Sequence, residues 1–366
     1  MPMTPFLPEP EYRHGKPART AILYCNLGTP AHPTAAAVRP FLAQFLGDRR
    51  VVEIPRLLWL LILHGIILRL RPAKSAAKYA SIWTKDGSPL RIWTEKQASL
   101  LQGWLATRGH DVLVSHAMTY GQPSIAAQLS ALKERGVTRV LVLPAYPQYS
   151  ATTTASVFDA VYAWAARTRR IPELRFVNHY HDHPLYIEAL AKRVTRHWQE
   201  NGRGERLVMS FHGVPERTLT LGDPYHCECY KTARLLARRL GLEASQTMVT
   251  FQSRLGRAKW LEPYTEPSLI ALAKSGVTKV DVLCPGFTSD CLETLEEIAI
   301  EGRAAFVAAG GKELSYIPCM NDQPEWINAL CAISLAHLGG WKTDKPADSA
   351  TLLRSRAAAL SLGAKT

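Results

Sequence analysis

The stretch Cys284–Glu301 combines residue types that could move cations or protons. Its glutamates recur every fourth residue, at Glu293, Glu297 and Glu301. Residues four apart share one face of a helix, so on the predicted helix these carboxylates form one acidic column. Such a column could be a solvated face near Arg303 and Lys312. Because three stacked carboxylates repel one another, the sequence instead favours a path for cations or protons that opens beside Asp290.

A histidine follows a strand-like run in the second half of the chain. His212 comes directly after residues 207–211 and precedes Gly213, whose lack of a side chain allows a ligand to approach closely. At the carboxyl end of a strand, an imidazole is well placed to act as a base or a metal ligand. Glu293 lies just beyond the last predicted strand of the same half, and a neutral imidazole with an ionised carboxylate suits a divalent first-row metal. We therefore expect His212 and Glu293 to act as a pair.

Aromatic and hydroxyl-bearing residues could form a cradle for a flat ligand. Tyr146–Ser150 and Thr152–Thr154 join apolar ring faces to hydrogen-bond donors. The aromatic side chains that could sandwich a planar molecule are Tyr120, Tyr146, Trp260 and Phe287. Arg71 and Arg254 could bind its carboxylates. Each aromatic side chain alone could equally belong to a packed core.

Two further clusters have residue types that bind metals. One contains the alternating histidines His179, His181 and His183. Because residues 182–184 (Asp-His-Pro) indicate the start of a helix, a structural role is favoured for these histidines. The other cluster, Cys227 and Cys229, lacks the second nearby pair that a tetrahedral zinc site needs. We expect neither cluster to bind a metal.

The elements that would position these residues alternate along the chain. Strand-like apolar runs cover residues 21–25, 112–115, 140–144, 207–211, 248–251 and 280–283. Helical patterns include residues 95–107, 124–135, 155–168, 185–200, 230–241 and 325–337. This alternation predicts an α/β fold with parallel sheets, in which ligands bind beyond the carboxyl ends of the strands. The loops that could face one such cleft are 26–30, 144–156, 212–217 and 284–291.

An internal repeat indicates that the α/β unit is duplicated. Residues 131–150 align without gaps to residues 271–290, with eight of the twenty positions identical. The first half is the longer one, and the apolar segment 54–70 lies in its extra length. The expected parts are a flexible N-terminal tail (1–18), a first half (19–178) with an apolar insertion (50–80), a second half with the metal-site residues (179–340), and a C-terminal tail (341–366).

The apolar segment 54–70 bears on membrane contact. It is followed by basic residues that include Arg71 and Lys74, and it is interrupted by Arg56 and His64. The run is shorter than a membrane-spanning helix. It is therefore either a buried core helix or an exposed lip that touches lipid, and its place in an insertion favours a surface role.

Composition narrows the cellular setting. The formal net charge is +13, but the basic residues are scattered and no nucleic-acid-binding motif accompanies them. The N-terminal residues are polar and Pro-rich, without the pattern of a signal peptide, and the seven cysteines indicate reduced thiols. We expect a cytoplasmic protein, free or peripherally bound at the inner face of the membrane, without a nucleic-acid partner.

Seven motifs occur in order between residues 20 and 335. They are NLGTP (26–30), GSPL (87–90), YPQYSATTTAS (146–156), SFHGVPER (210–217), GDPYHCECYKTA (222–233), FQSRLGRAKWLEPYT (251–265) and PGFTSDCLETLEEI (285–298). Together they resemble the ferrochelatase family, whose members insert iron into protoporphyrin in the last step of haem synthesis. The resemblance implies two Rossmann-like domains, as in other duplicated chelatases, with a cleft between them and an apolar lip.

The resemblance also implies roles for individual residues. His212 and Glu293 match the active-site and iron-binding pair of the family, and Glu297 and Glu301 match its acidic path. Asp290 matches a pocket position beside that path. The other matching pocket residues, which we expect to bind porphyrin together with Tyr120, Tyr146 and Arg254, are Arg71, Tyr79, Ser88, Trp260 and Phe287.

Several positions bear on the substrate and on cofactors. Thr119 replaces an arginine that commonly precedes Tyr120 in the family, so one substrate contact is absent or supplied elsewhere. Cys291 replaces a histidine of animal members, so the role of that histidine does not transfer. Residues 342–366 lack the cysteines that hold an iron–sulfur cluster in some members, so we expect no permanently bound cofactor. Residues 26–28 (Asn-Leu-Gly) resemble the protoporphyrin-using branch.

The expected substrates are therefore protoporphyrin IX and Fe²⁺, with two protons released. Two alternatives stay open. A non-catalytic porphyrin or haem carrier would need the cradle but not the acidic column. A cobalt chelatase would act on another, more acidic tetrapyrrole. The sequence leaves open whether the protein is a monomer or a homodimer.

Overall fold

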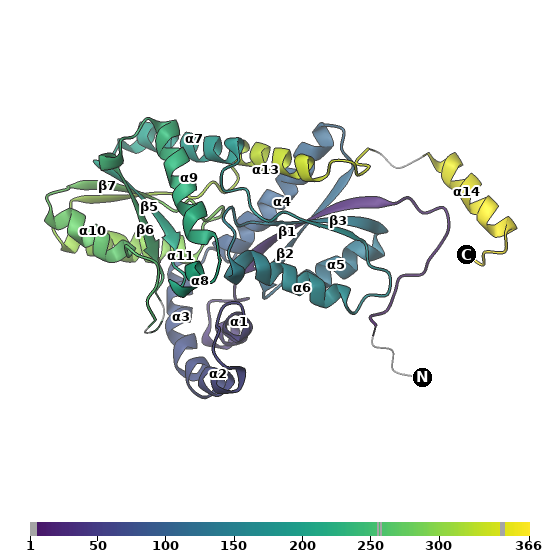
Figure 1. Cartoon of the computed structure of the whole chain (residues 1–366), viewed down its shortest axis with the longest axis horizontal. Helices are drawn as coiled ribbons and strands as arrows, with labels where there is room; N and C mark the ends of the chain where they lie inside the picture. Colours follow the sequence, from purple (N-terminus) through teal and green to yellow (C-terminus); the bar gives the residue numbers. More distant parts are fainter. Residues whose placement is uncertain (1–5, 255, 257, 345–347) are drawn as a thin grey trace.

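Two four-stranded parallel sheets form the centre of the protein (Figure 1). The computed structural model describes residues 6–254, 256, 258–344 and 348–366. The strand order is β2–β1–β3–β4 in the first sheet and β6–β5–β7–β8 in the second, and every neighbouring pair is parallel. Both sheets thus place the first strand of their half next to its second and third strands. The predicted α/β fold and its duplication are confirmed.

Each central strand is an apolar run, because both faces of the sheet are buried. The strands of the first sheet are β1 (Arg19–Gly28), β2 (Val112–Tyr120), β3 (Val137–Pro144) and β4 (Glu173–Phe176). Those of the second sheet are β5 (Arg206–His212), β6 (Thr247–Gln252), β7 (Lys279–Leu283) and β8 (Glu313–Ile317). The sequence patterns do not predict the edge strands β4 and β8, because each is short and carries charged residues.

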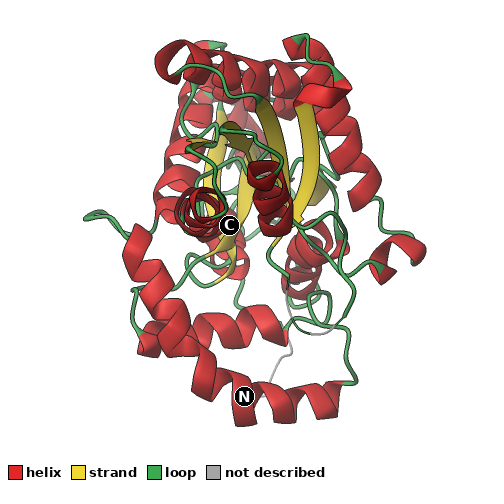
Figure 2. Cartoon of the chain, turned by 90° about the vertical axis from the view of Figure 1, so that its left-hand side faces the viewer, coloured by secondary structure: helices red, strands yellow, loops and turns green. Residues whose placement is uncertain are grey.

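Helices cover both faces of the sheets (Figure 2). In the first half they are α1 (Ala35–Gly47), α2 (Arg56–Ile62), α3 (Leu68–Ile82), α4 (Pro89–Thr107), α5 (Ile125–Glu134) and α6 (Ser156–Ala165). In the second half they are α7 (Pro184–Asn201), α8 (Arg217–Thr220), α9 (Tyr225–Leu240), α10 (Thr265–Lys274), α11 (Leu292–Leu295), α12 (Arg303–Ala308) and α13 (Pro324–His337). Proline occupies the first position of α4, α7 and α13, where its missing N–H leaves no further unpaired donor.

One apolar core joins the two halves. Although α13 comes last in the second half, it packs against α4 as well as α7. Its Trp326 is fully buried with Tyr186 of α7 and Tyr24 of β1. The two sheets are therefore held side by side by shared burial of large side chains.

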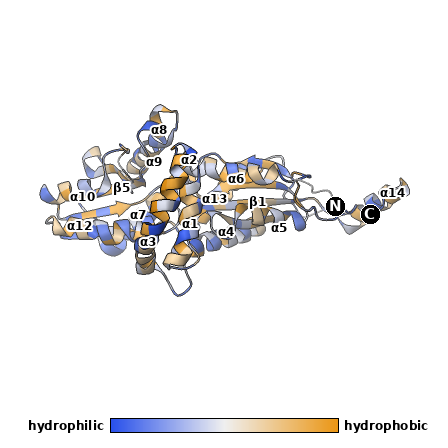
Figure 3. Ribbon diagram, turned by 90° about the horizontal axis from the view of Figure 1, so that it is seen from below, coloured by the Kyte–Doolittle hydropathy of each residue, from blue (hydrophilic) through white to orange (hydrophobic). Residues whose placement is uncertain are grey.

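The helices α1, α2 and α3 share one apolar cluster; α2 and most of α3 fall within the predicted insertion (50–80), and we call residues 54–70 the lip. Trp59, Leu63 and Leu68 are buried against α1, and the Trp59 indole donates to the Leu46 carbonyl oxygen at 2.6 Å. Four other leucines of this segment face solvent, namely Leu57 (82% exposed), Leu58, Leu61 (73% exposed) and Leu70. Figure 3 shows that most of α2 consists of hydrophobic residues. The segment thus has one buried side and one exposed apolar side, and its contact with lipid stays a prediction.

No helix within the described residues is both long and apolar enough to cross a membrane. Residues 12–14 lie beside the C-terminal residue Thr366, and Leu7 lies beside the end of α6. Leu7 N donates to the Arg167 carbonyl oxygen at 2.7 Å, and the Thr366 hydroxyl donates to the Tyr12 carbonyl oxygen at 2.6 Å. The C-terminal residues contain a further helix, α14 (Ser349–Ser361).

Candidate active site

The loops that follow β3 and β7 meet around a buried glutamine of α4. The amide nitrogen of Gln97 donates to the carbonyl oxygens of Thr288, at 2.9 Å, and Asn321, at 2.8 Å. Its Oε1 accepts from the Tyr24 hydroxyl at 2.8 Å. The Thr288 hydroxyl donates to the Ala145 carbonyl oxygen at 3.1 Å. These bonds join the carboxyl edges of the two sheets, which is the edge where parallel sheets bind ligands.

His212 is the last residue of β5 and is half-buried at this edge. Its Nδ1 lies 2.6 Å from the Gly213 carbonyl oxygen. A carbonyl oxygen can only accept, so Nδ1 carries a proton and a neutral ring keeps its lone pair on Nε2. A Cβ on Gly213 would lie 2.7 Å from the Gln252 carbonyl oxygen and 3.1 Å from the Trp260 ring. Only glycine therefore lets β5, β6 and the Trp260 loop approach so closely.

Two polar residues connect the His212 strand to the glutamates. Gln252 is paired with His212 in the sheet, and its side-chain amide donates to the Glu293 carbonyl oxygen at 2.7 Å. Ser253 donates to the Glu297 carboxylate from both its hydroxyl and its backbone N–H, the latter at 2.6 Å. Ser253 has φ = 66°, a conformation that costs energy for a residue other than glycine. The strained turn aims its N–H at Glu297.

The acidic segment is not the straight α-helix that a spacing of four predicts. Residues Glu297–Gly302 form a π-helical turn, and Glu301 N donates to the Glu296 carbonyl oxygen, five residues back, at 2.9 Å. This wider turn brings Glu296 and Glu301 to one cation, Lys78 of α3. The Lys78 Nζ lies 3.0 Å from Glu296 Oε2 and 2.8 Å from Glu301 Oε1. Burial raises the pKa of Glu296, and Lys78 offsets part of this rise.

Two of the three predicted glutamates line one pocket. Its volume is about 340 Å³, and Glu297, Glu301, Glu266 and Arg254 are among its lining residues. The guanidinium of Arg254 also lies over the Tyr264 ring, 5.4 Å from its centroid. The pocket thus gives the acidic residues a space that water or a small cation can enter.

Glu293 approaches the insertion rather than this pocket. Burial, and then the negative charge of Glu293, raise the pKa of the Tyr79 hydroxyl on α3. The same two causes, in the same order, raise the pKa of the neighbouring Cys291 thiol. Both groups therefore stay neutral beside Glu293 near neutral pH. Helix α3 and the acidic segment come together at this glutamate.

Asp290 is the most enclosed of the predicted acidic residues. Its carboxylate accepts from the Tyr316 hydroxyl at 2.6 Å, from the Asn321 amide at 2.6 Å and from Cys319 N at 3.2 Å. Among the described residues that line the 340 Å³ pocket, Asp290 does not occur. These bonds hold the loop after β7 against the segment after β8.

Some of the predicted porphyrin-binding residues lie on α3. The others lie near the ends of strands and loops at the carboxyl edge of the sheets. Arg71 is exposed on α3, Trp260 and Phe287 are half-buried, and Tyr146 follows β3. Ser88 is buried and accepts from the Thr29 hydroxyl at 2.9 Å. The Tyr120 hydroxyl donates to Asp48 Oδ2 at 2.7 Å. Ser88 and Tyr120 thus have bonding partners within the protein.

Sequence reasoning missed several residues that organise this site: Lys78, Gln97, Gln252, Ser253 and Glu296. A signal existed for Gln252 and Ser253, because both are polar residues at the carboxyl end of an apolar strand. Lys78 and Gln97 lie on helices, and the glutamates that Lys78 binds and the carbonyl oxygens to which Gln97 donates are more than 190 residues away in sequence. No local pattern could indicate such pairings.

The sequence model of the family described as Ferrochelatase matches residues 19–338. A ferrochelatase of Methylibium petroleiphilum is 67% identical over 358 residues, which cover 98% of this chain and 99% of that protein. A ferrochelatase of a Polaromonas species is 66% identical, with 98% and 99% covered. Among solved structures, the sirohydrochlorin chelatase SirB from Bacillus subtilis in complex with cobalt has a TM-score of 0.50 at 15% identity, covering 89% of this chain and 99% of SirB. At that identity the likeness to SirB concerns the fold.

Proposed function

Because this chain belongs to the ferrochelatase family, we propose that it inserts Fe²⁺ into protoporphyrin IX where the carboxyl edges of its two sheets meet. The protein is a metal chelatase, a lyase whose reaction yields haem. The residues Asn26-Leu27-Gly28 support protoporphyrin IX, rather than a more acidic porphyrin, as the substrate. Leu27 packs against the apolar residues of the insertion, which gives the substrate an apolar neighbour.

The observation that carries the proposed mechanism is the connection from His212 through Gln252 and Ser253 to the glutamates. Insertion must remove two protons from pyrrole nitrogens. With Nδ1 held by the Gly213 carbonyl oxygen, His212 can take a proton on Nε2 or pass on the metal. Glu293 is its proposed partner. Glu297 and Glu301, in the pocket with Arg254, would move ions between this pair and solvent.

The porphyrin-binding residues supply binding energy on both sides of the site. A macrocycle bent out of plane turns its nitrogen lone pairs toward an entering metal, and binding energy at its rim can drive that distortion. Arg71 and Arg254 are the proposed partners of its carboxylates. Tyr79, Tyr146, Trp260 and Phe287 are the proposed apolar contacts.

We further propose a peripheral membrane role for the lip and a cytoplasmic location. Leu57 and Leu61 project into solvent, and basic residues follow the segment in sequence. An apolar porphyrin would then pass between the lipid and the cleft without crossing water. We also propose that no iron–sulfur cluster takes part, since residues 342–366 contain no cysteine.

Neither alternative from the sequence is favoured by a structural observation. A carrier would have no use for the acidic segment, yet Lys78, Gln252 and Ser253 all position its carboxylates. Both close relatives named above are ferrochelatases, whereas the sirohydrochlorin chelatase shares the fold alone.

The test is anaerobic iron insertion by the purified protein with His212→Ala. We expect insertion to fall at least about 100-fold, the usual range for loss of a general acid or base. His110→Ala is the matched control, because His110 lies before β2 at the opposite edge of the sheet. Protoporphyrin IX and coproporphyrin III should be compared as substrates. Near wild-type turnover by His212→Ala would refute the assignment, and a preference for coproporphyrin III would refute the branch.

A further inference from the structure

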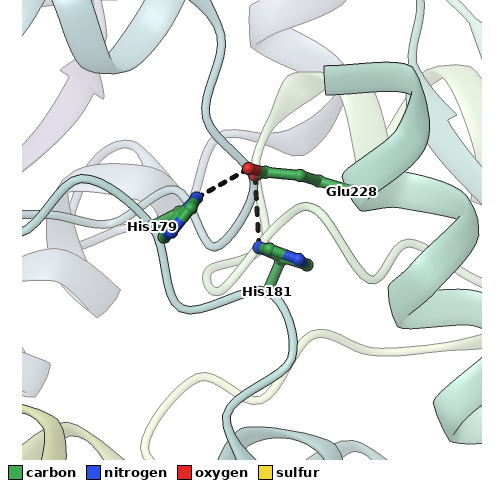
Figure 4. A group of neighbouring side chains, drawn as sticks. All are labelled: His179, His181 and Glu228. Carbon is green, nitrogen blue, oxygen red and sulfur yellow. Dashed lines mark hydrogen bonds and ion pairs between the residues drawn. The ribbon is translucent and has the colours of Figure 1, made fainter. Parts of the chain in front are cut away.

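Two histidines and one glutamate that are not among the proposed active-site residues converge (Figure 4). His179 and His181 come from the loop after β4, and Glu228 comes from the first turn of α9. The His179 Nδ1 lies 2.6 Å from Glu228 Oε1, and the His181 Nδ1 lies 3.3 Å from Glu228 Oε2. One ligand atom from each residue lies within 4.8 Å of the others. This is the separation at which three side chains can share one metal ion.

Burial of these polar side chains costs free energy unless a further group pairs with them. Glu228 and His181 are each 6% exposed, so both are almost removed from water. The His181 Nδ1 is buried and has no hydrogen-bond partner among the described residues, although it faces the carboxylate. An unpaired buried polar atom is costly, and a cation between the three side chains would satisfy it.

Among the described residues, no lysine or arginine forms an ion pair with the Glu228 carboxylate. Lys231, on the same helix, pairs instead with Asp182 at 2.5 Å. Glu228 Oε2 also accepts from Tyr149 N at 2.7 Å, which fixes the orientation of the carboxylate. Such outer bonds to a ligand are typical of metal sites.

The third histidine of the segment has a different role. His183 caps α7, and its side chain accepts from Leu185 N at 3.3 Å. The predicted helix start is thus confirmed, and the structural role expected for all three histidines applies to His183. The exposed Cys227 is not part of the cluster.

We propose that His179, His181 and Glu228 form a second divalent-metal site, for a first-row cation such as Zn²⁺, Co²⁺ or Fe²⁺. Two imidazole nitrogens and one carboxylate oxygen are the ligands that these ions share, and three protein ligands leave a fourth position open. The half-exposed side of His179 gives that position access to solvent. A bound ion would tie α9 to the loops after β3 and β4.

Co²⁺ binding to the porphyrin-free full-length protein tests the proposal, measured by equilibrium dialysis and by the visible spectrum of the bound ion. His212→Ala serves as the parent protein, because it removes the proposed active-site ligand. We expect this parent to bind one Co²⁺ per chain and to melt at a higher temperature with Co²⁺ present. Adding His179→Ala should weaken Co²⁺ binding by at least about 10-fold. Loss of a residue that only hydrogen-bonds to a metal ligand already weakens binding about 10- to 100-fold.

His183→Asn, two residues from His181, is the matched control: it keeps a capping acceptor and should leave Co²⁺ affinity unchanged. Since His179 is half-exposed, its removal should preserve the fold, which circular dichroism checks. Glu228→Gln gives a second variant, expected to lose Co²⁺ with its folded spectrum intact. The proposal is overturned if the parent binds no Co²⁺, or if His179→Ala binds it as tightly as the parent does. If the three side chains form only an ion pair without a metal, the parent should bind no Co²⁺ and His179→Ala should have a lower melting temperature.

Discussion

At the residue scale, Glu296 shows how burial opposes a charge that a neighbour supports. Burial raises its pKa although Lys78 lies 3.0 Å away. A carboxyl whose pKa is higher in the folded than in the unfolded state binds its proton more tightly when folded. Its contribution to stability is therefore full below the ordinary Glu pKa of about 4.3 and is lost as pH rises through the raised folded pKa.

We expect Glu296→Gln, which cannot ionise, to remove this pH-dependent loss. Relative to the wild type, the variant should gain stability as pH rises from about 4.3, on the order of 1 kcal/mol or less. Lys78→Met should have the opposite effect and extend the loss to higher pH, because Lys78 lowers the pKa of Glu296. Urea unfolding at a series of pH values measures both changes. Parallel stability curves for the wild type and Glu296→Gln would contradict the argument.

A residue of the site could be predicted from the sequence when local features mark it, but not when its role depends on a partner far away in the chain. The sequence indicates His212 because it ends an apolar run and precedes a glycine, and it indicates Glu297 by its spacing. Gln97 and Lys78 act across the two halves, so only the folded chain reveals them. Glu296 was missed for a different reason. A straight α-helix would turn it away from Glu301, and the π-helical turn brings both to Lys78.

At the element scale, periodicity predicts the buried strands and long helices because their residues share one environment. All six predicted strands lie within observed ones. The sequence does not predict β4 and β8, because these edge strands are short and partly solvated. The apolar segment 54–70 shows the limit of composition. Its apolar residues could fill a core or cover a surface, and only the position of α1 decides which side chains are buried.

The lip leads to a prediction about vesicles. Leu57→Ser with Leu61→Ser should weaken association with phospholipid vesicles at least about tenfold, since each leucine contributes roughly 1.5–3 kcal/mol when buried. Iron insertion in detergent should change little, because both side chains point away from the α1 contact. The matched control is Leu353→Ser with Leu362→Ser near α14, where the side chains are 62% and 89% exposed. Co-sedimentation that is equal for both double variants would show that the lip does not bind lipid.

At the scale of the whole molecule, duplication places equivalent strand ends at one edge, and buried polar contacts join the two copies. The sequence repeat predicts the first part, since residues 131–150 and 271–290 both run from a helix through a strand to its loop. It does not predict the junction, because the two copies differ where they meet. There α4 of one half supplies Gln97 to the loop of the other, and α13 of the second half packs on α4.

Gln97→Met tests whether this junction keeps the active site assembled. The substitution nearly preserves volume but leaves the carbonyl oxygens of Thr288 and Asn321 without their donor. Each buried group that loses its partner costs about 1–3 kcal/mol, so we expect a clear fall in melting temperature. Iron insertion should fall as well, because the loop carrying Thr288 leads into Glu293. Gln102→Met on the exposed side of α4, which loses one bond to Val114 N, is the matched control and should cost less. If the two variants melt and turn over alike, the Gln97 bonds have no part in holding the halves together or in positioning the site.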